Sequence, residues 1–196
     1  MYNGKYFSEV QKYCEDCKSG KIKANIYRIK AIDRFYKDLE DERYEFNPKD
    51  ADFIISIIQK TICHMQGETQ EGEPLRGTPF ILMPFHKFII YNLFGIYRKG
   101  TKIKKYHEAL IFIPRKNVKT SFSAALAYAV GLLYRKSGSK IYVVAAALKQ
   151  TLETFNFLKY NVRNMGESDE DGGLFHIIDN NNEHSINCLL YTSPSP

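Results

Sequence analysis

The stretch from residue 108 to residue 162 constrains the fold more than any other part of this chain of 196 residues. Two short apolar runs, 108–113 and 140–146, are each followed by a longer segment of helical character, 122–134 and 148–162. Continuous apolar runs of this length are typical of strands that are buried on both faces of a parallel sheet. The order strand, helix, strand, helix therefore predicts an α/β fold in which helices connect parallel strands.

The chain before this region is predicted to be mainly helical. Apolar residues recur at helical spacing in four segments, 5–18, 21–39, 51–65 and 85–94. The segment 66–78 is rich in Gly, Glu and Pro, lacks this periodicity and predicts a loop. We therefore expect a helical N-terminal region, 1–78, and a partial α/β domain, 79–187, which ends in short extended pieces at 174–178 and 185–190. The tail, 188–196, looks foreign to the rest, resembles translated adapter sequence and is left out of the fold prediction.

Composition narrows the class of protein. Hydrophobic residues make up 44% of the chain, but no apolar run is long enough to span a membrane. The N-terminus lacks the apolar core of a signal peptide, so we expect a protein used inside a cell. The formal net charge of +6 suits a polyanionic partner.

The four cysteines do not predict a metal site. Cys14 and Cys17 form one C-x-x-C pair, while Cys63 and Cys188 stand alone. Zinc sites use a second pair of ligands at a defined spacing, and thioredoxin-like sites follow a strand. We therefore expect structural thiols.

The loop between the first expected strand and the next helix reads Ile111-Phe-Ile-Pro-Arg-Lys-Asn-Val-Lys-Thr-Ser121. In a P-loop, backbone N–H groups surround phosphate oxygens at the start of a helix, a lysine reaches the β- and γ-phosphates, and a following Ser or Thr binds Mg²⁺. Lys119 and Thr120 stand at those positions, but the two glycines of the motif are replaced by Ile113 and Val118. The pattern alone leaves two interpretations open: a degenerate P-loop, or a helix start with a solvated lysine and a capping hydroxyl.

Pro114–Thr120 resembles the Walker A loop of the large terminase subunits of tailed bacteriophages, a family that commonly reads P-R-K-N-G-K-[ST] there. The similarity extends, in order and spacing, over about residues 5–187, through the segments 20–24, 34–39, 77–95 and 142–150. It implies a P-loop NTPase-type parallel sheet, incomplete in this chain, preceded by the helical region. It also implies a motor ATPase that packages double-stranded DNA into the capsid.

The resemblance also implies a set of site residues. Arg115 and Lys119 would be catalytic, because both would act on phosphate charge. Thr120 would ligate Mg²⁺, and ATP would be bound by a larger set: His86, Lys116, Asn117, Val118, Lys119, Thr120, Ser121 and Gln150. His86 departs from the family pattern, which usually has a glutamine at this position to read adenine. A neutral histidine cannot make both of the hydrogen bonds that a glutamine amide makes to the base.

Val118 is the second departure from the family. A glycine before the lysine permits the positive φ that such a loop often needs, and a β-branched residue strongly resists it. We therefore predict that the chain binds nucleotide more weakly than a version with glycine at this position.

By family, the partners are double-stranded phage DNA, the portal protein, the small terminase subunit and further copies of the full-length chain, in the cytoplasm of the bacterial host and with no membrane. No apolar run ends in Asp-Glu, so the sequence contains no recognisable Walker B motif, and the nuclease domain of the family is missing. We therefore expect an N-terminal fragment, and the ATPase activity of this fragment is left open. One alternative is a non-catalytic DNA- or protein-binding module with a degenerate P-loop. Another is a different P-loop NTPase, such as a helicase, which predicts helicase motifs beyond residue 187.

Overall fold

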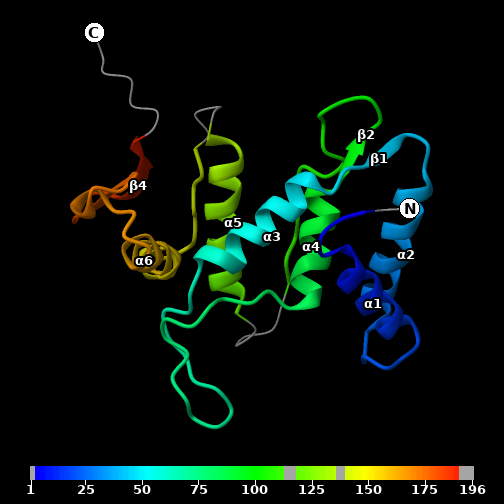
Figure 1. Ribbon diagram of the computed structural model, residues 1–196, viewed down its shortest axis with the longest axis horizontal. Coiled ribbons are helices and arrows are strands. Elements are labelled where there is room, and N and C mark those ends of the chain that lie inside the picture. Colours follow the sequence, from blue (N-terminus) through cyan, green and yellow to red (C-terminus); the bar gives the residue numbers. More distant parts are fainter. Residues whose placement is uncertain (1–2, 113–117, 136–139, 190–196) are drawn as a thin grey trace. The chain divides into compact units, whose positions relative to one another are not determined.

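The computed structural model describes residues 3–112, 118–135 and 140–189 (Figure 1). Helices dominate, and the strands form two small antiparallel sheets, β1 with β2 and β3 with β4. The elements are α1 (Phe7–Lys18), α2 (Ile26–Glu40), β1 (Tyr44–Phe46), α3 (Lys49–Thr61), α4 (Pro84–Phe94), β2 (Ile96–Arg98), α5 (Lys119–Leu133), α6 (Leu148–Asn164), the 3₁₀ helix η2 (Asp169–Asp171), β3 (Phe175–Asp179) and β4 (His184–Cys188).

The chain forms two compact units, and the division falls inside α3. Unit 1 contains the residues up to 56 together with 82–112, and unit 2 contains 57–81 together with the residues from 113 onward. Each unit thus combines two segments that are distant in sequence.

Unit 1 has an aromatic core between its helices. Phe7 of α1 meets the ring of Tyr91 of α4 edge-on, with centroids 5.4 Å apart, and Phe35 of α2 meets Phe88 in the same way at 5.4 Å. Such edge-to-face pairs add to the stabilisation that burial itself provides. The apolar periodicity of α1, α2 and α4 therefore serves one shared core.

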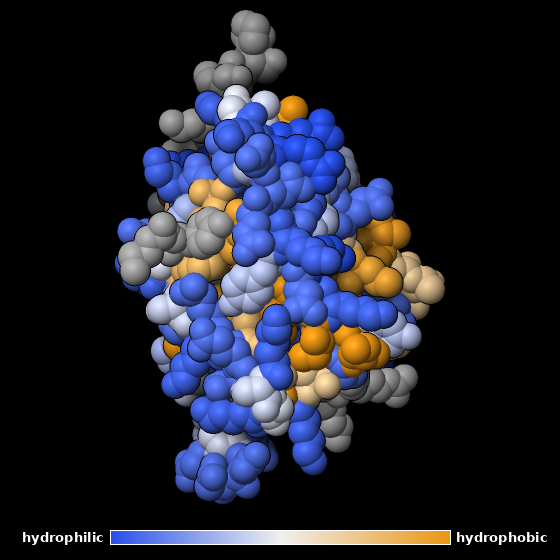
Figure 2. All heavy atoms as spheres, turned by 90° about the vertical axis from the view of Figure 1, so that its right-hand side faces the viewer, coloured by the Kyte–Doolittle hydropathy of each residue, from blue (hydrophilic) through white to orange (hydrophobic). Residues whose placement is uncertain are grey.

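The face that carries α1 and α2 is mostly hydrophilic, with hydrophobic patches between the polar residues (Figure 2). Ile26 and Tyr27, in the first turn of α2, are 60% and 77% exposed. Exposed apolar residues such as these are normal on a protein surface. We interpret most of the charged residues on this face as solvated surface.

The pairing of β1 with β2 could not be read from the sequence. Tyr44 lies opposite Arg98 and Phe46 opposite Ile96 in this antiparallel pair. An ion pair holds the segment after β2 to α3, since Lys104 pairs with Asp50 at 2.9 Å.

Unit 2 contains α5 packed against α6, the β3–β4 hairpin and the segment 57–81. Phe122 of α5 and Phe157 of α6 are buried, and the rings of Phe157 and Phe80 lie 6.2 Å apart. In the hairpin, Phe175 lies opposite Cys188 and Asp179 opposite His184. The extended pieces expected at 174–178 and 185–190 are thus confirmed as β3 and β4, each within two residues.

The expected helices are present with shifted ends. Helix α3 begins at Lys49, directly after Asn47-Pro48, and the Asn47 side chain accepts a hydrogen bond from the backbone N–H of Lys49. The prediction for α5 was 122–134, but the helix begins three residues earlier, at Lys119. As a result, Lys119 and Thr120 belong to its first turn.

The prediction of buried strands at 108–113 and 140–146 is wrong for the described residues. No strand is formed over 108–112 or 140–146, and the side chains are open to solvent: Leu110 is 93% exposed, Phe112 95% and Val144 88%. The physical reason is that a strand exists only through hydrogen bonds to a neighbouring strand, which a local apolar pattern cannot supply.

Candidate functional site

The candidate site lies at the N-terminus of α5, where the backbone adopts an unusual conformation at Val118. This residue caps the helix with φ 54° and ψ 21°, the left-handed region, and in the described residues it is the one non-glycine with positive φ. Val118 therefore adopts the positive φ expected of a glycine in such a loop, although a β-branched residue resists it. A β-branched residue is held there at a cost, because its Cβ crowds the backbone.

The first turn of α5 presents backbone N–H groups without a carboxylate nearby in sequence. Val118 has no side-chain oxygen to cap them, and the first turn contains no acidic residue. The carbonyl of Val118 accepts from the N–H of Phe122 at 2.8 Å, so the helix is already hydrogen-bonded from its first turn. Free N–H groups and the helix dipole together favour an anion such as a phosphate at this end.

Side chains at this turn are divided between solvent and core. Lys119 is exposed, Thr120 and Ser121 are partly buried, and Phe122 is completely buried. The buried Phe122 anchors the turn, while Lys119 is free to reach a ligand in front of the helix. The structure thus brings Val118, Lys119, Thr120 and Ser121 together at one helix terminus.

Thr120 suits a role as one ligand of Mg²⁺ but not as a complete site. It supplies a single hydroxyl oxygen, whereas Mg²⁺ takes six oxygen ligands and usually keeps waters and phosphate oxygens among them. Among the described residues, no group of three or more His, Cys, Asp or Glu side chains is arranged to hold a metal ion. A metal at Thr120 would therefore depend on phosphate oxygens, on water and on further acidic groups.

The other five predicted site residues lie elsewhere in the chain or outside its described part. Arg115, Lys116 and Asn117 lie outside the described residues. Gln150 is exposed in the first turn of α6, where its backbone N–H donates to the carbonyl of Ala147 at 3.0 Å.

His86 is placed in the capping arrangement of α4. Its ring is 1% exposed, and Nδ1 accepts a hydrogen bond from the backbone N–H of Met83 at 3.2 Å. The ring of Phe85 lies beside it, with centroids 3.9 Å apart. Burial lowers the pKa of His86 to about 4, so the imidazole is neutral at pH 7. The structure thus gives His86 a structural role at the start of α4, and contact with a nucleotide base would require the ring to become exposed.

The C-x-x-C pair lies in the hydrophobic core of unit 1. Cys14 and Cys17 are both buried in α1 as free thiols. Burial raises the pKa of the Cys14 thiol to about 12, which keeps it protonated at neutral pH. A protonated, buried thiol packs as a small apolar side chain.

Sequence reasoning did not single out two cations on α6, Lys159 and Arg163. Their spacing of four residues, with Asn156 and Tyr160 on the same face, was the available signal, and Arg76 joins them from the 66–78 loop around one cleft. This second set of polar residues is separate from the start of α5.

Comparison with known proteins gives one match. Residues 84–174 match the family model described as the terminase large subunit, ATPase domain. This range includes α4, α5, α6 and the loop before α5. No curated protein and no solved structure matches the chain. Among the described helices, none is both long and apolar enough to cross a membrane.

Proposed function

We propose that the chain is part of an ATP-driven motor that packages double-stranded DNA into a phage capsid, because residues 84–174 match the family model of the terminase large subunit ATPase domain. One observation carries this proposal: the match includes the turn where Val118 adopts the left-handed conformation at the start of α5. A left-handed residue directly before a helix is the kind of turn whose backbone N–H groups can surround a phosphate.

In this proposal each loop residue has a defined task. Lys119 binds the β- and γ-phosphates of ATP, and Thr120 supplies one oxygen to Mg²⁺. Arg115 stabilises the charge that develops on the γ-phosphate. The remaining loop and helix residues supply backbone or side-chain contacts to the nucleotide: Lys116, Asn117, Val118, Ser121 and Gln150. Bound Mg²⁺ would neutralise phosphate charge, while the chain orients the phosphates.

We further propose a P-loop NTPase-type parallel sheet, incomplete in this chain, because residues 84–174 match the family model of the terminase ATPase domain. The division into a helical region, 1–78, an ATPase part, 79–187, and a foreign-looking tail, 188–196, belongs to the same proposal.

The partners follow from the family. They are double-stranded phage DNA, the portal protein, the small terminase subunit and other copies of the full-length chain, in the cytoplasm of the bacterial host. The net charge of +6 supports a DNA partner, because phosphate contacts dominate DNA affinity.

The test is a DNA-stimulated ATPase assay on the longer open reading frame that contains this chain. Wild-type protein should hydrolyse ATP faster when duplex DNA is added. Lys119→Ala should lower the rate by at least about 100-fold, because the positive charge that stabilises the phosphates is lost. Lys102→Ala, which removes an exposed lysine of unit 1, is the matched control and should retain the rate. Equal rates for the two variants would contradict the assignment of Lys119.

A second candidate is a non-catalytic DNA- or protein-binding module. The observation that favours it is the β-branched Val118 in a conformation that suits glycine. The same assay separates the two functions: DNA binding without ATP hydrolysis by the longer protein would support the module and overturn the motor.

A further inference from the structure

Unit 2 contains a basic cleft that is separate from the start of α5. It has a volume of about 650 Å³ and lies between α6 and the segment 57–81. Its lining consists of three cations, three amides, one aromatic ring and one methionine: Arg76, Lys159, Arg163, Gln66, Asn156, Asn164, Tyr160 and Met65. None of the described residues that line it is acidic. We call this set the α6 cleft.

The α6 cleft follows from helical geometry. Asn156, Lys159, Tyr160 and Arg163 are spaced by three and four residues, which places them on one face of α6. The opposite face of α6 is buried, with Phe157 and Asn161 turned into unit 2. Helix α6 therefore presents a row of hydrogen-bond donors and two positive charges to the cleft.

Arg76 brings the third charge from the 66–78 loop. Its guanidinium lies over the ring of Tyr160, 5.3 Å from the centroid, and in the described part of the chain no carboxylate pairs with it. Stacking on Tyr160 holds the guanidinium in place while its N–H donors stay available. This arrangement is suited to an anionic ligand.

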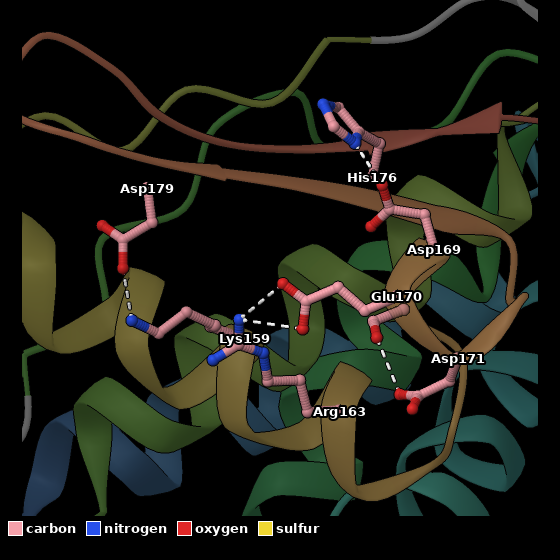
Figure 3. Close-up of polar contacts among 8 residues, drawn as sticks. Lys159, Arg163, Asp169, Glu170, Asp171, His176 and Asp179 are labelled. Atoms are coloured by element: carbon pink, nitrogen blue, oxygen red, sulfur yellow. Dashed lines mark hydrogen bonds and ion pairs between the residues drawn. The ribbon is translucent and has the colours of Figure 1, made fainter.

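The two cations of α6 are held at the edge of the cleft by exposed carboxylates (Figure 3). Lys159 pairs with Asp179 of β3, and Arg163 pairs with Glu170 of η2 at 3.2 Å. The side chains of Arg163 and Glu170 are 49% and 68% exposed. This exposed pair is weak, so a phosphate can displace Glu170 and take Arg163. The pair of Lys159 with Asp179 is less exposed, at 23% and 35%, and holds Lys159 more firmly.

We propose that the α6 cleft binds the phosphodiester backbone of duplex DNA. Guanidinium groups match phosphate geometry through paired hydrogen bonds, and asparagine amides also commonly contact phosphates. Charged groups and amides of this kind, without a pocket for a base, position a backbone and do not read its sequence. The choice of DNA among polyanions rests on the proposed function, whereas the cleft itself does not.

The test is fluorescence anisotropy of a labelled DNA duplex titrated with the full chain, without nucleotide, between about 50 and 200 mM salt. Arg76→Gln and Arg163→Gln should each weaken binding by about 5-fold, and the double variant should lower the slope of log affinity against log salt by about 2. Glu170→Gln should tighten binding by about 2-fold, because it releases Arg163. Circular dichroism verifies that each variant is folded.

The matched control is Arg43→Gln. Arg43 is an exposed arginine of unit 1 that pairs with Asp41 at 2.6 Å, so this variant removes the same charge outside the cleft. Binding by Arg76→Gln and Arg163→Gln that equals binding by Arg43→Gln would overturn the proposal. Displacement of the duplex by polyglutamate of equal charge at equal concentration would overturn the choice of DNA. Since no ATP is present, failure of ATP binding or hydrolysis leaves this result unaffected.

Discussion

The side-chain oxygen of Asn161 accepts a hydrogen bond of 2.7 Å from the backbone N–H of Cys63, a residue 98 positions away. Asn161 lies on α6 and is 1% exposed, and its amide nitrogen donates to the carbonyl of Phe157 at 3.0 Å. Both ends of this buried amide are therefore satisfied. The contact fixes α6 to the segment that follows α3 within unit 2.

Removal of this contact should destabilise the protein. Asn161→Ala leaves the N–H of Cys63 without its acceptor and should lower the free energy of unfolding by about 1–3 kcal/mol. Asn164→Ala, at an exposed position of the same helix, should change it by less than about 0.5 kcal/mol. Urea denaturation followed by circular dichroism measures both, and equal effects would contradict a structural role for the contact.

Val118→Gly should relieve backbone strain and improve nucleotide binding. Glycine adopts positive φ without a Cβ clash, so we expect a gain of up to about 1 kcal/mol in unfolding free energy and tighter binding of ATP. Val118→Ala is the control, because alanine removes the branch but keeps the Cβ. Urea denaturation and titration with a fluorescent ATP analogue measure the two effects. A glycine variant that binds ATP no better than wild type would refute the predicted weakness of this loop.

Glu9 should matter more than its partial exposure suggests. It pairs with Lys87, whose side chain is only 5% exposed, at 2.5 Å, and the same ammonium lies 5.1 Å above the ring of Tyr6. Glu9→Gln leaves a buried charge with less compensation and should cost about 1–3 kcal/mol of unfolding free energy. Asp33→Asn breaks the exposed pair with Lys18 and should cost less than about 1 kcal/mol. Thermal or urea unfolding of the two variants would show similar losses if burial of Lys87 were unimportant.

His86 should make the protein sensitive to mild acid. Burial lowers the pKa of His86 from 6.5 to about 4, so the unfolded state binds more protons than the folded state between these values. The free energy of unfolding should therefore fall as the pH falls through this window, by about 3 kcal/mol in total.

A variant without His86 isolates this effect. His86→Gln places the residue that the family usually has at this position and removes the titrating group, so most of the loss between pH 7 and pH 4 should disappear. His107→Gln, at an exposed position, should retain the wild-type dependence. Urea midpoints measured over this pH range provide the comparison, and an unchanged slope in His86→Gln would assign the acid sensitivity to other groups.

The sequence by itself determined the helices and the position of strain at the candidate site. Helical periodicity is a local property, so α1 to α6 could be predicted from neighbouring residues. The effect of a Cβ on φ is also local and marked Val118 as a strained position, but only the structure showed that Val118 adopts the left-handed conformation.

Tertiary structure alone decided which segments pair and which polar groups meet. The strand β1 was not expected because three residues carry too little pattern, and its pairing with β2 depends on a contact across the whole of α3 and α4. The apolar runs 108–112 and 140–146 show the opposite case, in which a strong pattern lacks a described partner strand. The contact between Asn161 and Cys63 and the assembly of Arg76 with Lys159 and Arg163 also join distant segments. Such contacts depend on how the chain packs in three dimensions, which the local pattern of residues does not specify.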